Sequence, residues 1–392
     1  MQWAKNQIKT DYMHCKKYTF LPLKTKNMNY KKWTFLPLFF ISFSLLAQKP
    51  LAKLKFISIY PKPIIGKGYK GAEDVKFGFE GGTAYKVNGV YYVFTTEVFD
   101  TPKTAAVRLA TWRSKDGIKF EKTGIIVETN RNWMDSTNRM SPWAPNAVFD
   151  PERNVWSVFH VGYKRKLNSS NVFNMTGRIF RYDSEVKGMK GIGGPYVEGD
   201  WLNIDKTPDW WEGPGEMVSF FPYKVGKEWW AFYGGNSVPD HVDASGTLNP
   251  NEKNIFYAGL VKSNGGLTDK WIRQSKLNPV KMDPEFIENS IVTKVAPNLY
   301  INLYDGGNKQ EISYAVSKDG IHWGKEQLLK LPNAPKWIKN TRTPLGLISE
   351  GNGLYTIYFT AFDGNNPDKV EPLWHDGFGN LGMIKIRLVT KQ

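Results

Sequence analysis

The sequence predicts an all-β fold, a five-bladed β-propeller, and three observations lead to this prediction. Short stretches rich in aromatic and β-branched residues, which favour strands, dominate the chain after residue 52. Five of these stretches directly follow a turn signal such as Asn88-Gly89. Polar residues that precede strands recur at equal intervals, 146 − 80 = 66 and 212 − 146 = 66. A repeat of this length, built from short strands, indicates a propeller or another radial β array.

The five hairpins define the predicted blades. Their second strands are expected at 91–96, 155–161, 228–233, 300–304 and 354–360, and the blades are expected to begin near residues 78, 141, 211, 286 and 341. Two near copies, 114–120 and 317–323, carry a tight Asp-Gly turn, and their separation of 317 − 114 = 203 residues is close to three repeats. The stretch 53–60 is expected to add a strand that helps to close the ring.

The N-terminal region has the order of a secretory signal. A basic stretch that begins at Met28 precedes the apolar run 34–47, and cleavage is expected near Ala47–Gln48. The run is short for a membrane span, with an uncleaved anchor as the alternative. We therefore expect residues 1–47, which include a possible upstream extension, to be a signal peptide. Residues 48–392 then form a single catalytic domain that is periplasmic or secreted, with no stable membrane insertion after cleavage.

Composition limits the chemistry and the partners. The single cysteine, Cys15, lies in the segment expected to be removed, which leaves no disulfide, thiol nucleophile or cysteine metal site. No metal-binding histidine spacing, phosphate loop or dinucleotide fingerprint predicts a metal or another cofactor. The formal charge is +16, and residues 1–47 hold eight lysines and one aspartate, so 16 − 7 = +9 remains. This charge favours acidic polysaccharide, with scattered surface lysines as the alternative. No nucleic-acid signature is present, and the sequence does not indicate an oligomeric state.

Two glutamates are the candidate catalytic residues. Glu80 and Glu212 each precede a glycine-containing turn and a strand, so both are expected to open the innermost strand of a blade. Two acids that face each other across a pit suit glycosidic hydrolysis, in which one donates a proton and the other activates water or attacks carbon. The alternative is that each glutamate bonds a nearby backbone turn. Glu216 is a rival acid, four residues after Glu212.

Further residues are expected to bind substrate. Arg342 would bind a carboxylate or sulfate with two prongs, or would instead neutralise the glutamates; both interpretations stay open. Asp305 follows a predicted strand, and it is expected either to be a turn residue or to line the rim of the pit. Trp143, near Asn146, and Trp210 and Trp211, next to Glu212, are candidates for stacking on sugar rings, and the two next to Glu212 are preferred. The complete set of predicted binding residues is Asn146, Trp143, Trp211, Glu288, Asp305 and Arg342.

Three motifs carry a resemblance to a known family. Glu80-Gly-Gly, Trp143-Ala-Pro and Glu212-Gly-Pro, each followed by an aromatic strand, resemble the glycoside hydrolase family 43 type of five-bladed propeller over roughly residues 55–390. The resemblance implies an Asp base from the first blade, an Asp that tunes the acid from the second, a Glu acid from the third, and inversion. By position, Glu80 falls where the base belongs, Asn146 where the tuning Asp belongs and Glu212 where the acid belongs.

The chain departs from this pattern at two of the three positions. Glu80 is longer than Asp, and Asn146 lacks the charge that would hold a proton on Glu212. Glu288 or Asp305 is an alternative base. The sequence thus predicts a glycosidase that acts on a plant or algal polysaccharide, including acidic ones. The alternatives are a carbohydrate-binding propeller without catalysis, or a uronate lyase that would use Tyr85 and His241.

Overall fold

The computed structural model describes residues 51–100, 106–129, 141–163, 177–205, 211–212, 217–236, 256–282, 287–306, 310–364 and 377–390. The chain divides into residues 1–48 and 49–392, and every described residue belongs to the second unit. The predicted signal peptide therefore lies outside the described residues. Within the described ranges, no helix has the length and apolar character needed to cross a membrane.

The described chain is all-β, as predicted, apart from one short 3-10 helix at Met189–Gly193. Its strands form one eight-stranded sheet and three antiparallel four-stranded sheets. The three smaller sheets are, in chain order, β6 (Ser141–Asp150), β7 (Val155–Tyr163), β8 (Gly177–Ser184) and β9 (Tyr196–Glu198); β10 (Ser219–Val225), β11 (Glu228–Asn236), β12 (Phe256–Ser263) and β13 (Trp271–Arg273); and β14 (Glu288–Ala296), β15 (Leu299–Asp305), β16 (Glu311–Ser317) and β17 (Gln327–Lys330).

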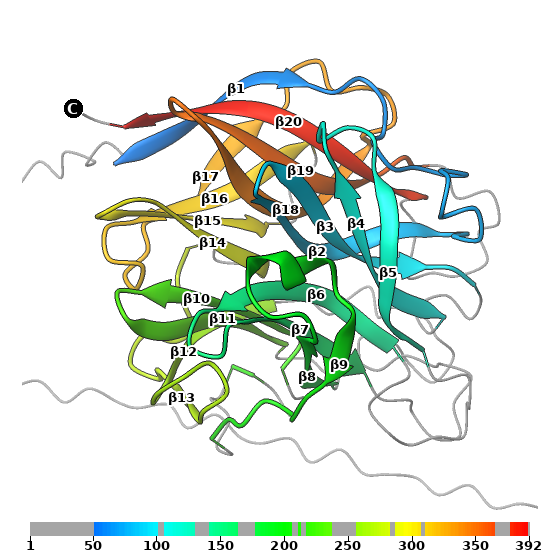
Figure 1. Cartoon of the computed structure of the whole chain (residues 1–392). Helices are drawn as coiled ribbons and strands as arrows, with labels where there is room; N and C mark the ends of the chain where they lie inside the picture. The colour runs from blue at the N-terminus through cyan, green and yellow to red at the C-terminus, as the bar shows by residue number, and fades with distance from the viewer. Residues whose placement is uncertain are drawn as a thin grey trace, which may run out of the picture. The chain divides into compact units, whose positions relative to one another are not determined.

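The eight-stranded sheet combines two four-stranded units from opposite ends of the chain (Figure 1). The first unit contains β2 (Gly78–Val87), β3 (Val90–Val98), β4 (Val107–Ser114) and β5 (Glu121–Glu128), and the second contains β18 (Asn340–Gly351), β19 (Leu354–Phe362), β20 (Gly379–Thr390) and β1 (Ala52–Ile59). A single parallel pair, Gly78 with Gly379, joins the units. The N-terminal strand pairs antiparallel with β20, which confirms the predicted strand at 53–60.

The hairpin turns follow from residues that tolerate a left-handed backbone. Asn88, Asn154 and Asn352 have φ values of 50°, 56° and 51°, and Gly226 has 61°. Short polar residues and glycine adopt this conformation at low cost, and it matches the twist of the flanking strands. Each predicted second strand is present, and four of the five predicted blade starts lie within two residues of an observed strand start. The exception is 211, because β10 begins only at Ser219.

The first strands of the five four-stranded units contact one another in a cycle. β2 contacts β6, β6 contacts β10, β10 contacts β14, β14 contacts β18, and β18 contacts β2. The core consists of apolar clusters, each lying between two neighbouring units. One example packs Phe159 and Val161 of β7 against Phe220 and Trp229 of the next sheet. Residues on the first strands of distant units are thereby brought together.

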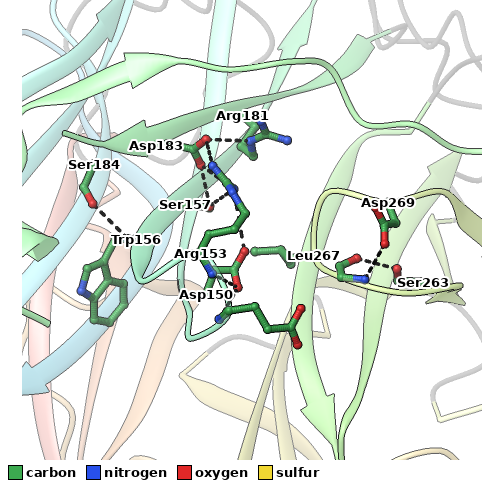
Figure 2. A network of polar contacts seen from close by, with 12 residues as sticks. Asp150, Arg153, Trp156, Ser157, Arg181, Asp183, Ser184, Ser263, Leu267 and Asp269 are labelled. Atoms are coloured by element: carbon green, nitrogen blue, oxygen red, sulfur yellow. Dashed lines mark hydrogen bonds and ion pairs between the residues drawn. The ribbon is translucent and has the colours of Figure 1, made fainter. Parts of the chain in front are cut away.

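A polar network fastens the turn between β6 and β7 to β8 (Figure 2). The Asp183 carboxylate accepts hydrogen bonds from Arg153 at 3.2 Å, Ser157 at 2.6 Å and Arg181 at 3.2 Å. Burial opposes ionisation of this group, but the bonds from Arg153 and Ser157 prevail and lower the pKa of Asp183. Asp150 caps the turn by accepting from the backbone N–H of Glu152 at 3.0 Å. These bonds fix the C-terminal end of β6, whereas Trp143 lies near its N-terminal end.

Candidate functional site

The first strands of four units each present one residue at an equivalent level of their hairpin. The partner of this residue is Thr96, Val161, Gly234 or Asp305, and each partner lies six residues after the first residue of its second strand. The first-strand residues at this level are Glu80, Trp143, Ser219 and Glu288. This register, unlike a count along the sequence, identifies the positions that are structurally equivalent.

Bulges mark the same level. The pairing register shifts directly after Glu80, Trp143 and Glu288, and again between Thr341 and Pro344 on β18. The residues that follow the first three, Gly81, Ala144 and Asn289, have φ values of 56°, 51° and 54°. A bulge bends its strand and redirects side chains, and bulges are common beside active sites. The bulges thus coincide with the predicted site residues Glu80, Trp143, Glu288 and Arg342.

The register corrects the equivalence that the 66-residue interval suggested. Glu80 is equivalent to Trp143 rather than to Asn146, because Glu80 pairs with Thr96 and Trp143 with Val161, whereas Asn146 pairs with Phe159, beyond the β6 bulge. Glu212 does not open the third inner strand, because β10 begins 219 − 212 = 7 residues later, at Ser219. Equal spacing in sequence therefore conceals bulges and connections of different lengths.

A charged cluster forms where three of the five units meet. Arg342 Nε donates to Oε1 of Glu80 at 2.6 Å. The same guanidinium lies 2.7 Å from Oε2 of Glu288 and also bonds Asp305. The side chains of Glu80, Asp305 and Glu288 are 4%, 5% and 11% exposed, against 25% for Arg342. Four predicted site residues, from β2, β14, β15 and β18, thus form one group centred on the arginine. We call them the Arg342 cluster.

Glu80 has an unusual environment within this cluster. Its Oε2 is buried and has no hydrogen-bond partner. Burial raises the pKa of Glu80 from its ordinary value of 4.5 to about 7, although Arg342 acts to lower it, and the charges of Glu288 and Asp305 raise it further. A carboxyl group with this pKa exchanges a proton near neutral pH.

Tyr163, at the end of β7, is a neighbour of the cluster that the sequence did not reveal. Its hydroxyl donates to the carbonyl of Val218 at 3.2 Å. Burial raises the pKa of Tyr163 well above its usual value, and the nearby charges of Glu288 and Glu80 add to the effect. A tyrosine at the end of an aromatic strand reads as core in a sequence, so no signal distinguished it.

Glu212 is held by a different arginine. Arg273, on β13 at the edge of the sheet that runs from β10 to β13, donates Nε to Oε1 of Glu212 at 2.7 Å and Nη2 to Oε2 at 2.8 Å. The hydroxyl of Tyr233 on β11 adds a bond to Oε1 at 2.9 Å. A two-pronged, charge-assisted contact of this kind stabilises the ionised carboxylate. Arg273 was also missed, because it lies in a short strand without a motif.

The remaining predicted residues make contacts within the protein. The Asn146 side chain is buried, and its Nδ2 donates to the carbonyl of Phe220 at 3.1 Å, which ties β6 to β10. Trp211 is fully buried, with its ring 5.2 Å from that of Tyr233. Its faces are therefore covered by the core, whereas Trp143 is only half-buried. The other candidates, Trp210, Glu216 and His241, lie outside the described residues.

A cavity continues along the strands of the Arg342 cluster. It has a volume of about 400 Å³ and is lined by 83–86 of β2, 291–294 of β14 and 345–349 of β18. The lining begins three residues beyond Glu80, Glu288 and Arg342, since 83 − 80, 291 − 288 and 345 − 342 all equal 3. Among the described residues, no group of three or more His, Cys, Asp or Glu is arranged to hold a metal ion.

Comparisons with known proteins place this architecture. No family profile and no curated protein matches the sequence. Among solved structures, Zg3597, a family 117 glycoside hydrolase from the marine bacterium Zobellia galactanivorans, is similar with a TM-score of 0.57 and 12% identity, over 86% of this chain and 90% of that one. BT0996, solved as a complex with RGII, is similar with a TM-score of 0.56 and 11% identity, over 86% of this chain and 93% of its own.

A family 43 enzyme is also similar. CoXyl43, a β-xylosidase/α-arabinofuranosidase from a compost microbial metagenome, has a TM-score of 0.50 and 11% identity, over 86% of this chain and 95% of that one. At these identities the likeness establishes the fold and leaves the activity to the residues of the site. The chain therefore has a divergent form of the propeller fold found in family 43-like glycoside hydrolases.

Proposed function

We propose that the chain is a glycoside hydrolase that cleaves O-glycosidic bonds in a plant or algal polysaccharide or its oligosaccharides by paired-carboxylate catalysis. The Arg342 cluster carries this proposal. Hydrolysis needs one carboxyl group that donates a proton and one ionised carboxylate. Glu80 has a pKa of about 7, and Glu288 is paired with the guanidinium of Arg342. The cluster thus offers both kinds of group within a single site.

We further propose that the scaffold is a five-bladed propeller. The five four-stranded units, the contact cycle of their first strands and the apolar clusters between neighbouring units support this arrangement. The first strand of each blade would line the axis, which would put the Arg342 cluster there. The pairing of β1 with β20 would then close the ring with a strand from the N-terminal part of the chain.

The substrate group in the pit is proposed to be an uncharged sugar. The sequence left two roles open for Arg342, and its contacts with three carboxylates favour the neutralising role. A uronate or sulfate would have to compete with these carboxylates and would add charge to an acidic pocket. The basic charge of +9 after residue 47 would act elsewhere, on acidic parts of a longer polymer.

Export is part of the proposal. Residues 1–47 are proposed to be removed as a signal peptide, which would release the catalytic domain into the periplasm or the medium. The intact mass of the protein recovered from each cell fraction tests this, since cleavage near Ala47 removes the only cysteine together with the signal.

Product release across a panel of purified polysaccharides tests the activity. We expect new reducing ends from at least one of them with the wild-type chain, none with Glu80→Gln, and full activity with Glu228→Gln. Glu228 is a matched control because it lies on the surface of β11, where it pairs with Lys262. Cleavage by Glu80→Gln at the wild-type rate would remove Glu80 from the mechanism.

A second candidate is a carbohydrate-binding propeller without catalysis. It is favoured by the engagement of Asn146 and Glu212 with partners inside the protein. Oligosaccharide binding by calorimetry, without reducing ends after long incubation, would establish it. The uronate lyase is less well supported, because the Tyr85 hydroxyl donates to the carbonyl of Ala147 and burial raises the pKa of Tyr85. An unsaturated uronate product, seen by ultraviolet absorbance, would establish a lyase instead.

A further inference from the structure

We propose that Glu80, rather than Glu212, is the acid of this site, and that Glu288 is the carboxylate that activates water. The inference rests on the proposed hydrolase function and reverses the role that the family 43 resemblance gives to Glu80. It places both chemical roles in the Arg342 cluster and gives Glu212 a structural role on Arg273.

The charge balance of the cluster gives the first argument. Glu80, Glu288 and Asp305 share the single guanidinium of Arg342, so full ionisation would leave two uncompensated negative charges in a largely buried space. Carboxylates that share a site disfavour each other's ionisation, and a bound proton relieves the repulsion. The cluster is therefore expected to retain one proton under conditions in which an isolated glutamate is ionised.

The hydrogen bonds indicate where this proton resides. Glu80 uses Oε1 to accept from Arg342, and its Oε2 is buried without a hydrogen-bond partner. A charged oxygen in that position would lack both water and a donor, which is costly, whereas a neutral hydroxyl is much less so. Oε2 of Glu288 is also buried without a hydrogen bond, but it lies 2.7 Å from the guanidinium of Arg342, and the Glu288 side chain as a whole is the most exposed of the three, at 11%.

Every charged or titratable group with a described effect on Glu80 fits this assignment. Glu288 and Asp305, from β14 and β15, disfavour its ionisation, and Arg342, from β18, favours it. Tyr163, from β7, is neutral at ordinary pH because burial raises its pKa. The burial of Glu80 outweighs the attraction of Arg342.

Glu212 has the opposite environment. Both of its oxygens accept hydrogen bonds from Arg273, and Tyr233 donates a further one. A proton on either oxygen would replace a prong of this contact and leave a buried guanidinium poorly paired. These contacts hold Glu212 as a hydrogen-bond acceptor, which is the wrong arrangement for a proton donor.

The proposed step conserves atoms and electrons. The O–H bond of Glu80 breaks as its proton moves to the glycosidic oxygen, and the bond from that oxygen to the anomeric carbon breaks with its electron pair left on oxygen. A water molecule bonds to the anomeric carbon and gives a proton to Glu288. One glycoside and one water become a free sugar and an alcohol, and transfer of the proton from Glu288 to solvent and from solvent to Glu80 restores the site.

A direct titration of Glu80 tests the proton assignment without a substrate. Glutamate labelled with ¹³C at the side-chain carboxyl would be followed by NMR across the acidic and neutral pH range. We expect one carboxyl to titrate near 7 in the wild type and in Glu228→Gln, and to vanish in Glu80→Gln. Titration of Glu80 near its ordinary value of 4.5 would overturn the inference.

Asp305→Asn keeps Glu80 in place and provides a second test. The substitution removes one negative neighbour and one competitor for Arg342, and both changes favour the ionised form of Glu80. The Glu80 titration, and with it the alkaline limb of kcat/KM against pH, should shift to lower pH by about one unit, equivalent to about 1.4 kcal/mol. An unchanged alkaline limb in a folded Asp305→Asn variant would contradict the donor role of Glu80.

The two proposals fail in different ways. If no polysaccharide is cleaved although Glu80 titrates near 7, the hydrolase proposal falls and takes the donor role with it. If a polysaccharide is cleaved although Glu80 titrates in the ordinary range, only the role assignment falls. Loss of all turnover in a fully stable Glu212→Gln variant would return the acid role to Glu212.

Discussion

Arg342 donates its Nε to Oε1 of Glu80 at 2.6 Å, although 262 residues separate the two in the chain. The bond connects β18 with β2, and the same guanidinium reaches Glu288 on β14. It is therefore both a contact between the two ends of the fold and the electrostatic centre of the candidate site. A residue with these two roles should affect stability and activity together.

Arg342→Met is expected to lower the free energy of unfolding by about 3–5 kcal/mol. The methionine replaces the volume but leaves three buried carboxylates without their cation, and breaking a buried ion pair from one side has a cost of this size. Urea unfolding measures it. Arg113→Met is the matched control, because Arg113 is 57% exposed and its pair with Glu121 lies on the surface; exposed pairs contribute about 0–1 kcal/mol. If Arg342→Met lost no more unfolding free energy than Arg113→Met, about 0–1 kcal/mol, the stability of the cluster would not depend on Arg342.

Glu212→Gln should also destabilise the protein, by about 3–5 kcal/mol, because the amide cannot satisfy both prongs of Arg273. A double-mutant cycle with Arg273→Met isolates the coupling between the two side chains. The expected coupling is at least about 1 kcal/mol, while Glu228→Gln changes stability little. A Glu212→Gln variant with wild-type unfolding would show that the contact with Arg273 contributes nothing, and would leave the catalytic interpretation of Glu212 to be preferred.

The bulge behind Glu80 gives a third prediction. Gly82 has φ 136°, and a Cβ at this position would lie 1.9 Å from the carbonyl oxygen of Phe94. Gly82→Ala must therefore shift β2 against β3, with an expected loss of at least about 4 kcal/mol or failure to fold. Gly124→Ala on β5 is the control, since its Cβ would approach nothing closer than Oγ1 of Thr111 at 3.6 Å. Equal stability of the two variants would show that β2 accommodates a side chain at the bulge.

The sequence predicted the strands and the four members of the Arg342 cluster for physical reasons. Aromatic and β-branched runs after Asn-Gly turns indicate strands through local preference, and residues that open inner strands meet wherever those strands meet. Glu80, Glu288 and Arg342 were predicted in this way, and Asp305 was predicted as a residue that follows a strand. The neutralising role of Arg342 was one of two that the sequence left open, and the contact with Asp305 was not predicted.

The residues that sequence reasoning misplaced or missed depend on connections and tertiary contacts. Glu212 lies seven residues before β10, and a count of 66 residues cannot show how a connection folds. Asn146 lies three residues beyond Trp143, which is at the level of Glu80, and the irregular pairing of β6 between them cannot be read from a residue count. Arg273 and Tyr163 acquire their roles only from neighbours that are distant in sequence, Glu212 and the Arg342 cluster.

The dependence of stability on pH gives a final test of Glu80 that needs no substrate. Its pKa is about 7 in the folded protein and 4.5 when unperturbed, so between these values the folded state holds a proton that the unfolded state has lost. Stability falls with rising pH wherever the folded state binds more protons. Glu80 should therefore lower the free energy of unfolding progressively from about pH 4.5 to 7, by roughly 3 kcal/mol in all for a shift of this size.

Glu80→Gln removes the titrating group, so the unfolding free energy of Glu80→Gln minus that of the wild type should grow across this range and level off above it. Urea unfolding at closely spaced pH values, with Glu228→Gln as the charge control, measures this difference. A difference that stays constant from about pH 4 to about pH 8 would show that folding does not shift the pKa of Glu80, with Arg342 offsetting the effect of burial.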